Sequence, residues 1–161
     1  MRPLASIDPN EVPCVAHGTL IATDQGETLV HHLSIGERVF SPNLGFDFVE
    51  QVFQLSRSVC RGAQLKRFLA NSAGNRSELV ISMACKVRPQ HSLTPRPNQL
   101  VTEPTEATVA GEVFENTAAI ALFCVVLRTG SLMIANGGVV SAMSKRELLH
   151  VLDRPNLERP K

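Results

Sequence analysis

One cysteine at the front of the first predicted strand is the residue in this chain best suited to covalent chemistry. Cys14 follows Pro13 and opens the stretch CVAHGTLIATDQGETLVHHLSIGERVFSPNLG, in which strands alternate with short turns. Its sulfur can close a five-membered ring on the Pro13 carbonyl carbon, which would convert the Pro13–Cys14 amide into a thioester. Because an amide is stable and planar, the attack needs a distorted bond or a proton for the leaving nitrogen. Cys14 is therefore predicted to be either a reactive end or a small buried hydrophobe.

Histidine is the side chain that would supply such a proton, because imidazole titrates near neutrality. His91 lies in RPQHSL, and a lone histidine after Pro-Gln is by itself typical of a solvated loop. His31 and His32 are adjacent, so on a predicted strand their side chains point to opposite faces and no metal site is expected there. His17 is interpreted as turn surface.

The elements that must hold these residues are mainly β-strands, because the apolar residues recur with a period of two. TLIATDQGETLV predicts a hairpin that turns at Asp24-Gln25-Gly26, and further turns are expected at Gly36 and over 42–45. A polar loop over 71–77 joins two more strands. Buried strands are expected over 118–127 and 131–141, separated by a turn over 128–130.

One helix is predicted near the C-terminus. Ser144-Lys145-Arg146-Glu147 has the pattern of a capping box, in which the serine and glutamate side chains satisfy free backbone N–H groups reciprocally. The expected apolar face of this helix consists of Leu148, Leu149, Val151 and Leu152.

Composition favours one domain with a real core. The chain has 161 residues, is 43% hydrophobic and carries a formal net charge of +1. Neither charge sign forms a long run and there is no Trp or Tyr, so no nucleic-acid partner is expected. The ten apolar residues over 118–127 are too few for the roughly 20 of a membrane helix.

Cysteine spacing and the first residues favour a reducing compartment. MRPLASIDPNEVP has no apolar core and contains three prolines, so it does not read as a signal peptide. The four cysteines are far apart, with no C-x-x-C, which predicts free thiols and a cytoplasmic location. Cys60, Cys85 and Cys124 are expected to be small buried hydrophobes. No cofactor or metal is expected.

The stretch that begins at Cys14 resembles the opening block of a Hint domain, the self-processing module of inteins, hedgehog autoprocessing regions and a bacterial Hint group. In that family a first Cys is followed by G-T-x-I-x-T, a Gly turn and V-x-x-L-x-x-G-D-x-V. Glu37 replaces the Asp of this pattern. The matching positions are Cys14, Gly18, Thr19, Ile21, Thr23, Gly26, Val30, Leu33, Gly36 and Val39.

Two later segments extend the resemblance to about residue 142. RPQHSL is similar to the S/T-P-Q-H-R block of the bacterial group, with Arg88 in place of the hydroxyl residue, which implies His91 as the catalytic histidine. LMIANGGVVSA is similar to the closing A-N-G strand. An alternative alignment places Cys85 of SMACKV at the position of the family's catalytic histidine, and this chain would then have no histidine in that role. Thr19, Arg88 and Asn136 are implied as possible supporting residues.

The resemblance implies an all-β fold, a Hint-type horseshoe of curved strands with pseudo-twofold halves, plus a C-terminal helix. Residues 1–13 would be an exposed N-terminal lead-in, 14–142 the Hint-like domain, and 143–161 the helix and tail. Inteins end on His-Asn, where this chain has Ser141 and Ala142, so splicing is not expected. Proteins of the bacterial group commonly carry a histidine a few residues before A-N-G, and this chain has Thr129-Gly130-Ser131 at that place.

Two functions of different classes follow from the resemblance. In the first, Cys14 attacks the Pro13 carbonyl, His91 protonates the leaving nitrogen, and the thioester is resolved by water or an external nucleophile, which releases the domain's own N-terminal segment. In the second, a catalytically degenerate Hint fold serves as a structural or protein-interaction module. A Cys/His hydrolase acting on other molecules is a weaker third interpretation, because no orienting Asn or Asp can be assigned.

Overall fold

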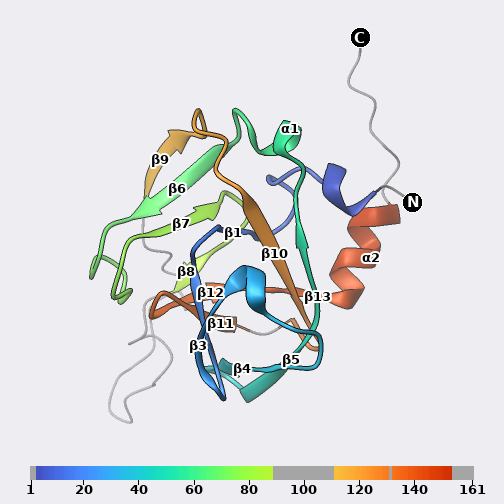
Figure 1. Ribbon diagram of the computed structural model, residues 1–161, viewed down its shortest axis with the longest axis vertical. Helices are drawn as coiled ribbons and strands as arrows, with labels where there is room; N and C mark the ends of the chain where they lie inside the picture. The colour runs from blue at the N-terminus through green and yellow to red at the C-terminus, as the bar shows by residue number, and fades with distance from the viewer. Residues whose placement is uncertain (1–2, 89–110, 131, 154–161) are drawn as a thin grey trace, which may run out of the picture.

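The computed structural model describes residues 3–88, 111–130 and 132–153, and the strands among them form one curled half-barrel sheet (Figure 1). The strands pair antiparallel, except that β13 runs parallel to β10. The sheet is ordered β8-β12-β11-β2-β4-β5-β10-β1-β7-β6-β9, with β3 beside β2 and β13 beside β10. The strands are β1 (Val15–Ala16), β2 (Leu20–Thr23), β3 (Gly26–Leu29), β4 (Arg38–Ser41), β5 (Gly45–Gln54), β6 (Gln64–Phe68), β7 (Leu79–Ser82), β8 (Val87–Arg88), β9 (Glu112–Glu115), β10 (Leu122–Leu127), β11 (Leu132–Ala135), β12 (Gly138–Ser141) and β13 (Met143–Ser144).

The first hairpin is confirmed, and its turn chemistry explains it. Strands β2 and β3 are joined by Asp24-Gln25, and Gly26 has a φ of +102°, a conformation that glycine adopts without steric cost. The Thr23 hydroxyl donates to the Gly26 carbonyl at 2.6 Å and accepts from the Gln25 N–H at 3.1 Å. These bonds fix the register of β2, the strand that follows the Cys14 segment.

The expectation of a single strand over 131–141 is wrong, because the chain turns back at Asn136-Gly137. Strands β11 and β12 pair antiparallel across that dipeptide, with a φ of +49° at Asn136 and +83° at Gly137. Positive φ at both central residues is the type I′ hairpin geometry for which Asn-Gly is the preferred sequence. The expected strand over 118–127 is also shorter and begins at Leu122 as β10.

Two buried clusters lie on opposite faces of β10, all six residues of which are buried. Successive side chains of a strand point to opposite faces, so odd and even residues enter different clusters. The first core contains Val15, Val49, Leu79, Ile81, Phe123, Val125 and Leu127 among others. The second core contains Ile7, Val12, Cys14, Ala16, Cys60, Leu65, Leu122, Cys124, Val126 and Leu148 among others.

Part of the N-terminal segment is buried, which corrects the expectation of an exposed lead-in. Ile7 and Val12 are 0% exposed and belong to the second core, and a short 3₁₀ turn over Leu4–Ser6 precedes them. Burying two branched apolar side chains contributes about 1.5–3 kcal/mol each. The segment before Cys14 is therefore held against the sheet, and Pro13 with it.

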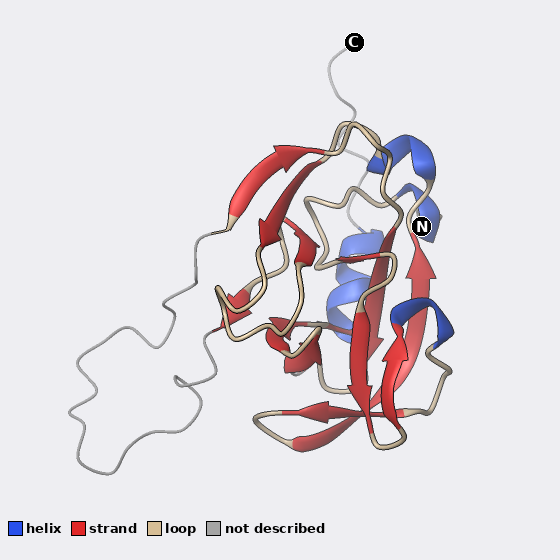
Figure 2. Cartoon of the chain, turned by 60° about the vertical axis from the view of Figure 1, so that its left-hand side comes forward, coloured by secondary structure: helices blue, strands red, loops and turns tan. Residues whose placement is uncertain are grey.

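Helix α2 (Lys145–Asp153) packs its apolar side on the second core, on one side of the sheet (Figure 2). The predicted capping box is confirmed: the Ser144 N–H donates to Glu147 Oε1 at 3.0 Å, and the Glu147 N–H donates to Ser144 Oγ at 3.1 Å. Three residues of the predicted apolar face, Leu148, Val151 and Leu152, are buried. The fourth, Leu149, is 43% exposed. A second helix, α1 (Arg57–Cys60), is a single turn.

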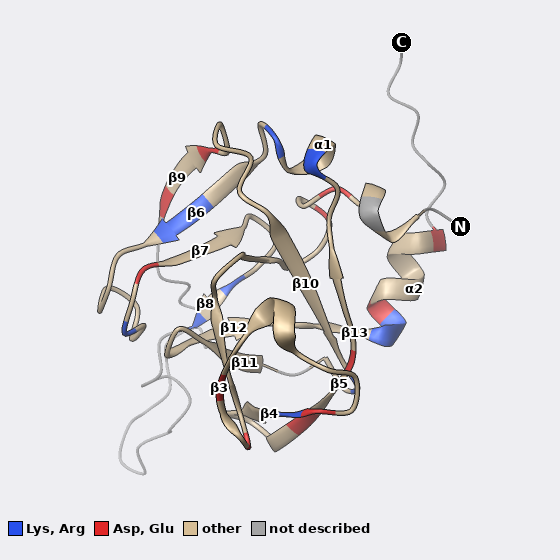
Figure 3. Cartoon of the chain, in the orientation of Figure 1, with Lys and Arg blue, Asp and Glu red and all other residues tan. Residues whose placement is uncertain are grey.

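Acidic and basic residues are spread over many elements, and the basic residues of β6 lie beside the acidic residues of its neighbour β9 (Figure 3). Ion pairs such as Arg128–Glu50, with Nε and Oε1 3.2 Å apart, join neighbouring strands at the surface. Within the described part of the chain, no helix has the length and apolar character needed to cross a membrane.

Candidate functional site

Cys14 lies at the entrance of β1, the short strand that pairs with β10 on one side and β7 on the other. Its side chain is only 1% exposed and belongs to the second core. The site around it is built from three segments that are distant in sequence: the N-terminal segment, the end of β7 and the start of β10.

Ser82, at the end of β7, contacts the backbone on both sides of Pro13. The Cys14 N–H donates to Ser82 Oγ at 2.8 Å, and the same hydroxyl donates to the Val12 carbonyl at 2.9 Å. The Ser82 N–H donates to the Cys14 carbonyl at 2.9 Å. Ser82 is 0% exposed, so these bonds form without competition from water. One hydroxyl thus holds the nitrogen of the Pro13–Cys14 peptide bond.

Sequence reasoning did not assign Ser82 a role. Its available signals were a hydroxyl residue at the end of the apolar strand LVIS and its place in SMACKV, the segment of the alternative alignment. In the structure, Cys85 of that segment is fully buried, and its thiol lies 3.6 Å from the Ser141 carbonyl, to which it donates. Within SMACKV it is therefore Ser82, at the end of β7, that contacts the Cys14 N–H.

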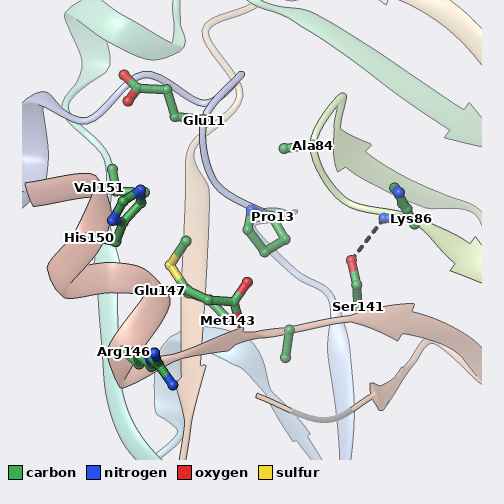
Figure 4. A pocket seen from close by; sticks show the side chains of 11 residues that line it. Glu11, Pro13, Ala84, Lys86, Ser141, Met143, Arg146, Glu147, His150 and Val151 are labelled. Atoms are coloured by element: carbon green, nitrogen blue, oxygen red, sulfur yellow. Dashed lines mark hydrogen bonds between the residues drawn. The ribbon is translucent and has the colours of Figure 1, made fainter. Parts of the chain in front are cut away.

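A cavity of about 670 Å³ opens next to Pro13 (Figure 4). Ala84 and Lys86 lie on one side of it, and Glu147 and His150 of α2 lie on the other. A volume of this size is in the range of small-molecule sites. Pro13 therefore borders a space that a small nucleophile can enter, while the Cys14 side chain is buried.

The Cys14 thiol is surrounded by other thiols, and this environment keeps it protonated. Burial raises the pKa of Cys14 well above its ordinary value, and a hydrogen bond with the Cys124 thiol raises it further, followed by Cys85 and Cys60. Burial also raises the pKa of Cys85 to about 12. A protonated thiol is a weak nucleophile, so any reaction at Cys14 starts from the neutral form at pH 7.

Because these pKa values are raised, the stability of the fold changes with pH in the alkaline range. Above about pH 8.5 the unfolded chain loses thiol protons that the folded chain retains, so the folded state binds more protons and stability falls as pH rises, by up to about 1.4 kcal/mol per pH unit for each thiol. Burial also lowers the pKa of Lys66, and this shift alone would make stability rise with pH, opposite to the effect of the thiols. The chain has no Tyr to add a further titration.

We therefore expect the free energy of unfolding to decline between about pH 8.5 and pH 10, and to decline less steeply in Cys14→Ala, which lacks one of the raised thiols. Urea unfolding at a series of pH values measures both slopes. Parallel slopes for the two proteins would show that the Cys14 pKa is not raised in the folded state.

Two of the predicted supporting residues, Thr19 and Asn136, form side-chain hydrogen bonds to backbone groups rather than to the Cys14 thiol. The Thr19 hydroxyl donates to the Ala16 carbonyl at 2.6 Å within the turn after β1. Asn136 Oδ1 accepts from the Leu20 N–H at 2.8 Å, and its Nδ2 donates to the Glu78 carbonyl at 2.9 Å. Both side chains therefore join strands near the site.

Arg88 lies in β8, opposite Val139 of β12, and is half-buried. His91, the predicted proton donor, lies outside the residues that the structure describes. The prediction that it protonates the leaving nitrogen is thus neither supported nor opposed by the geometry, and the described neighbour of that nitrogen is Ser82.

The expectation that His31 and His32 point to opposite faces is wrong, because they lie in a 3₁₀ turn over Val30–His32 rather than in a strand. Their ring centroids are 4.3 Å apart, and His17 stacks on His31 at 4.4 Å. Burial, followed by the other two imidazoles, lowers the pKa of His31. Across the described ranges, no three His, Cys, Asp or Glu side chains are arranged to hold a metal ion.

The backbone of this chain aligns with solved structures of inteins and of an intein-like domain. The "gp41-1 intein" aligns with a TM-score of 0.50 at 16% identity, over 81% of this chain and 98% of the intein. The "Bacterial Intein-Like domain from Clostridium thermocellum" aligns with a TM-score of 0.54 at 8% identity, over 80% of this chain and 97% of that domain. This chain has the Hint fold. The "MchDnaB-1 intein (N145AA)" aligns similarly, with a TM-score of 0.51, 15% identity and coverages of 81% and 99%.

No family model and no curated protein matches the sequence, so the likeness is one of structure. At these identities it establishes the Hint fold and leaves the chemistry to this chain's own residues. The predicted all-β Hint-type architecture with a C-terminal helix is confirmed.

The structure places two segments in which this Hint domain departs from the family pattern. Ser141 and Ala142, which stand where inteins have His-Asn, line the cavity beside Pro13. Thr129, in the segment that replaces the histidine of the bacterial group, donates its hydroxyl to Asp47 Oδ2 at 2.6 Å. Asp47 is 2% exposed, so this pair is a buried polar link between β5 and the end of β10.

Proposed function

We propose that this Hint domain processes itself at the Pro13–Cys14 bond without splicing. The Cys14 sulfur attacks the Pro13 carbonyl carbon, the S–C bond forms and the C–N bond breaks. The thiol proton ends on the Cys14 nitrogen, which becomes a free amine, and residues 1–13 are then held as a thioester. Because attacking and attacked groups belong to adjacent residues, the step has the advantage of an intramolecular reaction.

The observation that carries this proposal is the hydroxyl of Ser82 on the leaving nitrogen. Ser82 Oγ is 2.8 Å from the Cys14 nitrogen, within the distance at which a group can pass a proton. The same oxygen holds the Val12 carbonyl, so the scissile bond is fixed in position on both sides of Pro13. We infer that Ser82 positions this bond and relays to the Cys14 nitrogen the proton that the thiol gives up, with His91 as the proposed shuttle between them.

The cavity beside Pro13 supports resolution of the thioester by an outside nucleophile. Water or a small amine or thiol that enters next to Lys86 and His150 would reach the acyl carbon of Pro13. The C–S bond then breaks, the acyl group passes to the nucleophile, and Cys14 regains its thiol. The domain's own N-terminal segment is the substrate.

Splicing is not part of the proposal, because residues 141 and 142 have no side-chain carboxamide that could cyclise and release the chain that follows. That chain is also an integral part of the fold: Met143 pairs with Val126, and Leu148 is buried in the second core. Cleavage before Cys14 would leave α2 attached.

Intact mass of freshly purified protein tests the proposal, after incubation with and without dithiothreitol or hydroxylamine. We expect a product that lacks residues 1–13, accelerated by either nucleophile, and no such product from Cys14→Ala. Cys60→Ala is the matched control, since Cys60 is a buried thiol of the same core. Hydroxylamine also cuts Asn-Gly bonds, so a product cut at Asn136–Gly137 does not count.

An unchanged mass in all conditions would contradict self-processing. It would favour the second candidate, a catalytically degenerate Hint fold that serves as a structural or protein-interaction module. The observation behind that candidate is the Cys14 thiol itself, which is buried, surrounded by other thiols and shifted to a higher pKa.

A further inference from the structure

Cys124 lies directly across from Cys14 in the sheet. Strands β1 and β10 pair antiparallel with Val15 opposite Phe123 and Ala16 opposite Leu122, so the next pair outward is Cys14 and Cys124. The His17 N–H donates to the Ala121 carbonyl at 2.9 Å. Because hydrogen-bonded and non-hydrogen-bonded pairs alternate along an antiparallel ladder, the cysteine pair occupies a non-hydrogen-bonded position.

Non-hydrogen-bonded pairs are the closest pairs of such a ladder. Their Cα atoms are about 4.5 Å apart, which falls inside the window of roughly 4.4–6.8 Å that a disulfide spans. Both side chains point to the same face, since Cys14 and Cys124 are members of the second core. The Cys124 thiol is also one of the groups that raise the pKa of Cys14.

We propose that Cys14 and Cys124 form a reversible disulfide when the protein meets a thiol oxidant. Each thiol loses its proton, the S–S bond forms, and the two electrons reduce a small-molecule disulfide or diazene oxidant, which takes up the protons. The link withdraws the sulfur of Cys14 from any attack on Pro13. Its consequence for self-processing rests on the proposed function, whereas the link itself does not.

The other two cysteines are less well placed for this bond. Cys60 is the C-terminal residue of α1 and its thiol lies 3.9 Å from the Leu55 carbonyl, to which it donates. The Cys85 thiol faces the Ser141 carbonyl at 3.6 Å. Neither lies opposite Cys14 in a strand pair. All four cysteines are free thiols in the described structure, so the reduced form is the starting state.

The test is a thiol count on the full chain before and after treatment with the oxidant diamide. The protein is denatured in N-ethylmaleimide and its mass is measured, followed by non-reducing digestion. We expect all four thiols to be labelled in the reduced protein, only two after oxidation, and a linked peptide pair that contains Cys14 and Cys124. Treatment with a phosphine reductant should restore all four.

Variants separate this pair from the alternatives. Cys124→Ala should show the same number of labelled thiols before and after oxidation, whereas Cys60→Ala should still lose two. Should Cys124→Ala fail to fold, the linked peptide from the wild-type chain decides alone. An unchanged thiol count in the wild type, or linked peptides that contain Cys60 or Cys85, would overturn the proposal.

The count is made on uncleaved chain, so its outcome does not depend on self-processing. A chain that never releases residues 1–13 but gives the linked peptide contradicts the proposed function and supports the disulfide. In a chain that does process itself, hydroxylamine should release residues 1–13 only after the phosphine has reduced the oxidised sample.

Discussion

Ser82→Ala should slow release of residues 1–13 on the order of 10²-fold, the size of effect expected when a positioned proton-transfer group is removed. Alanine leaves the Cys14 nitrogen and the Val12 carbonyl without the hydroxyl that contacts both. Rates are measured by intact mass in hydroxylamine. Ser82→Thr keeps a hydroxyl on the same carbon, so it should recover most of the rate.

The control for this prediction is a buried serine away from the site. Ser41 is 3% exposed and its hydroxyl donates to Asn43 Oδ1 at 2.7 Å, so Ser41→Ala loses a partly buried hydrogen bond without touching Cys14. Both alanine variants are expected to lose about 1–3 kcal/mol of stability. Equal cleavage rates in Ser82→Ala, Ser41→Ala and the wild type would remove Ser82 from the mechanism.

Asn136→Ala should destabilise the domain by roughly 3 kcal/mol, because two costs add. The Leu20 N–H and the Glu78 carbonyl lose their side-chain partner, about 1–3 kcal/mol. Alanine is also strained at the φ of +49° that Asn136 adopts, by about 1–2 kcal/mol. Urea unfolding gives the change directly.

A second substitution at this position tests the prediction further. Asn136→Asp keeps an oxygen for Leu20 and tolerates the left-handed conformation, so it should lose less stability than alanine. The sequence implied a supporting role for Asn136 in the chemistry, whereas its contacts indicate a role in folding. A variant that unfolds at the wild-type urea concentration yet fails to cleave would restore the chemical role.

Much of the local structure was predictable, because it depends on residues close together in the chain. Gly26 permits the turn between β2 and β3, and the Ser144 and Glu147 side chains cap α2 across three residues. The same kind of signal was present in Asn136-Gly137, and reading 131–141 as one strand overlooked it. Leu149 was misassigned because four apolar positions within five residues span more of a helix than one packing face can bury.

The sequence by itself determined the all-β class, the first hairpin, the capped helix and the prominence of Cys14, since turn conformations, caps and alternating burial are short-range properties. Tertiary structure alone decided the rest of the site. Ser82 meets Cys14 across 68 residues of chain, and Cys124 faces it across a strand pair, because both contacts depend on which strands become neighbours and in what register. Register is set by the packing of two cores on opposite faces of β10, where a shift of one residue would move every side chain to the other face.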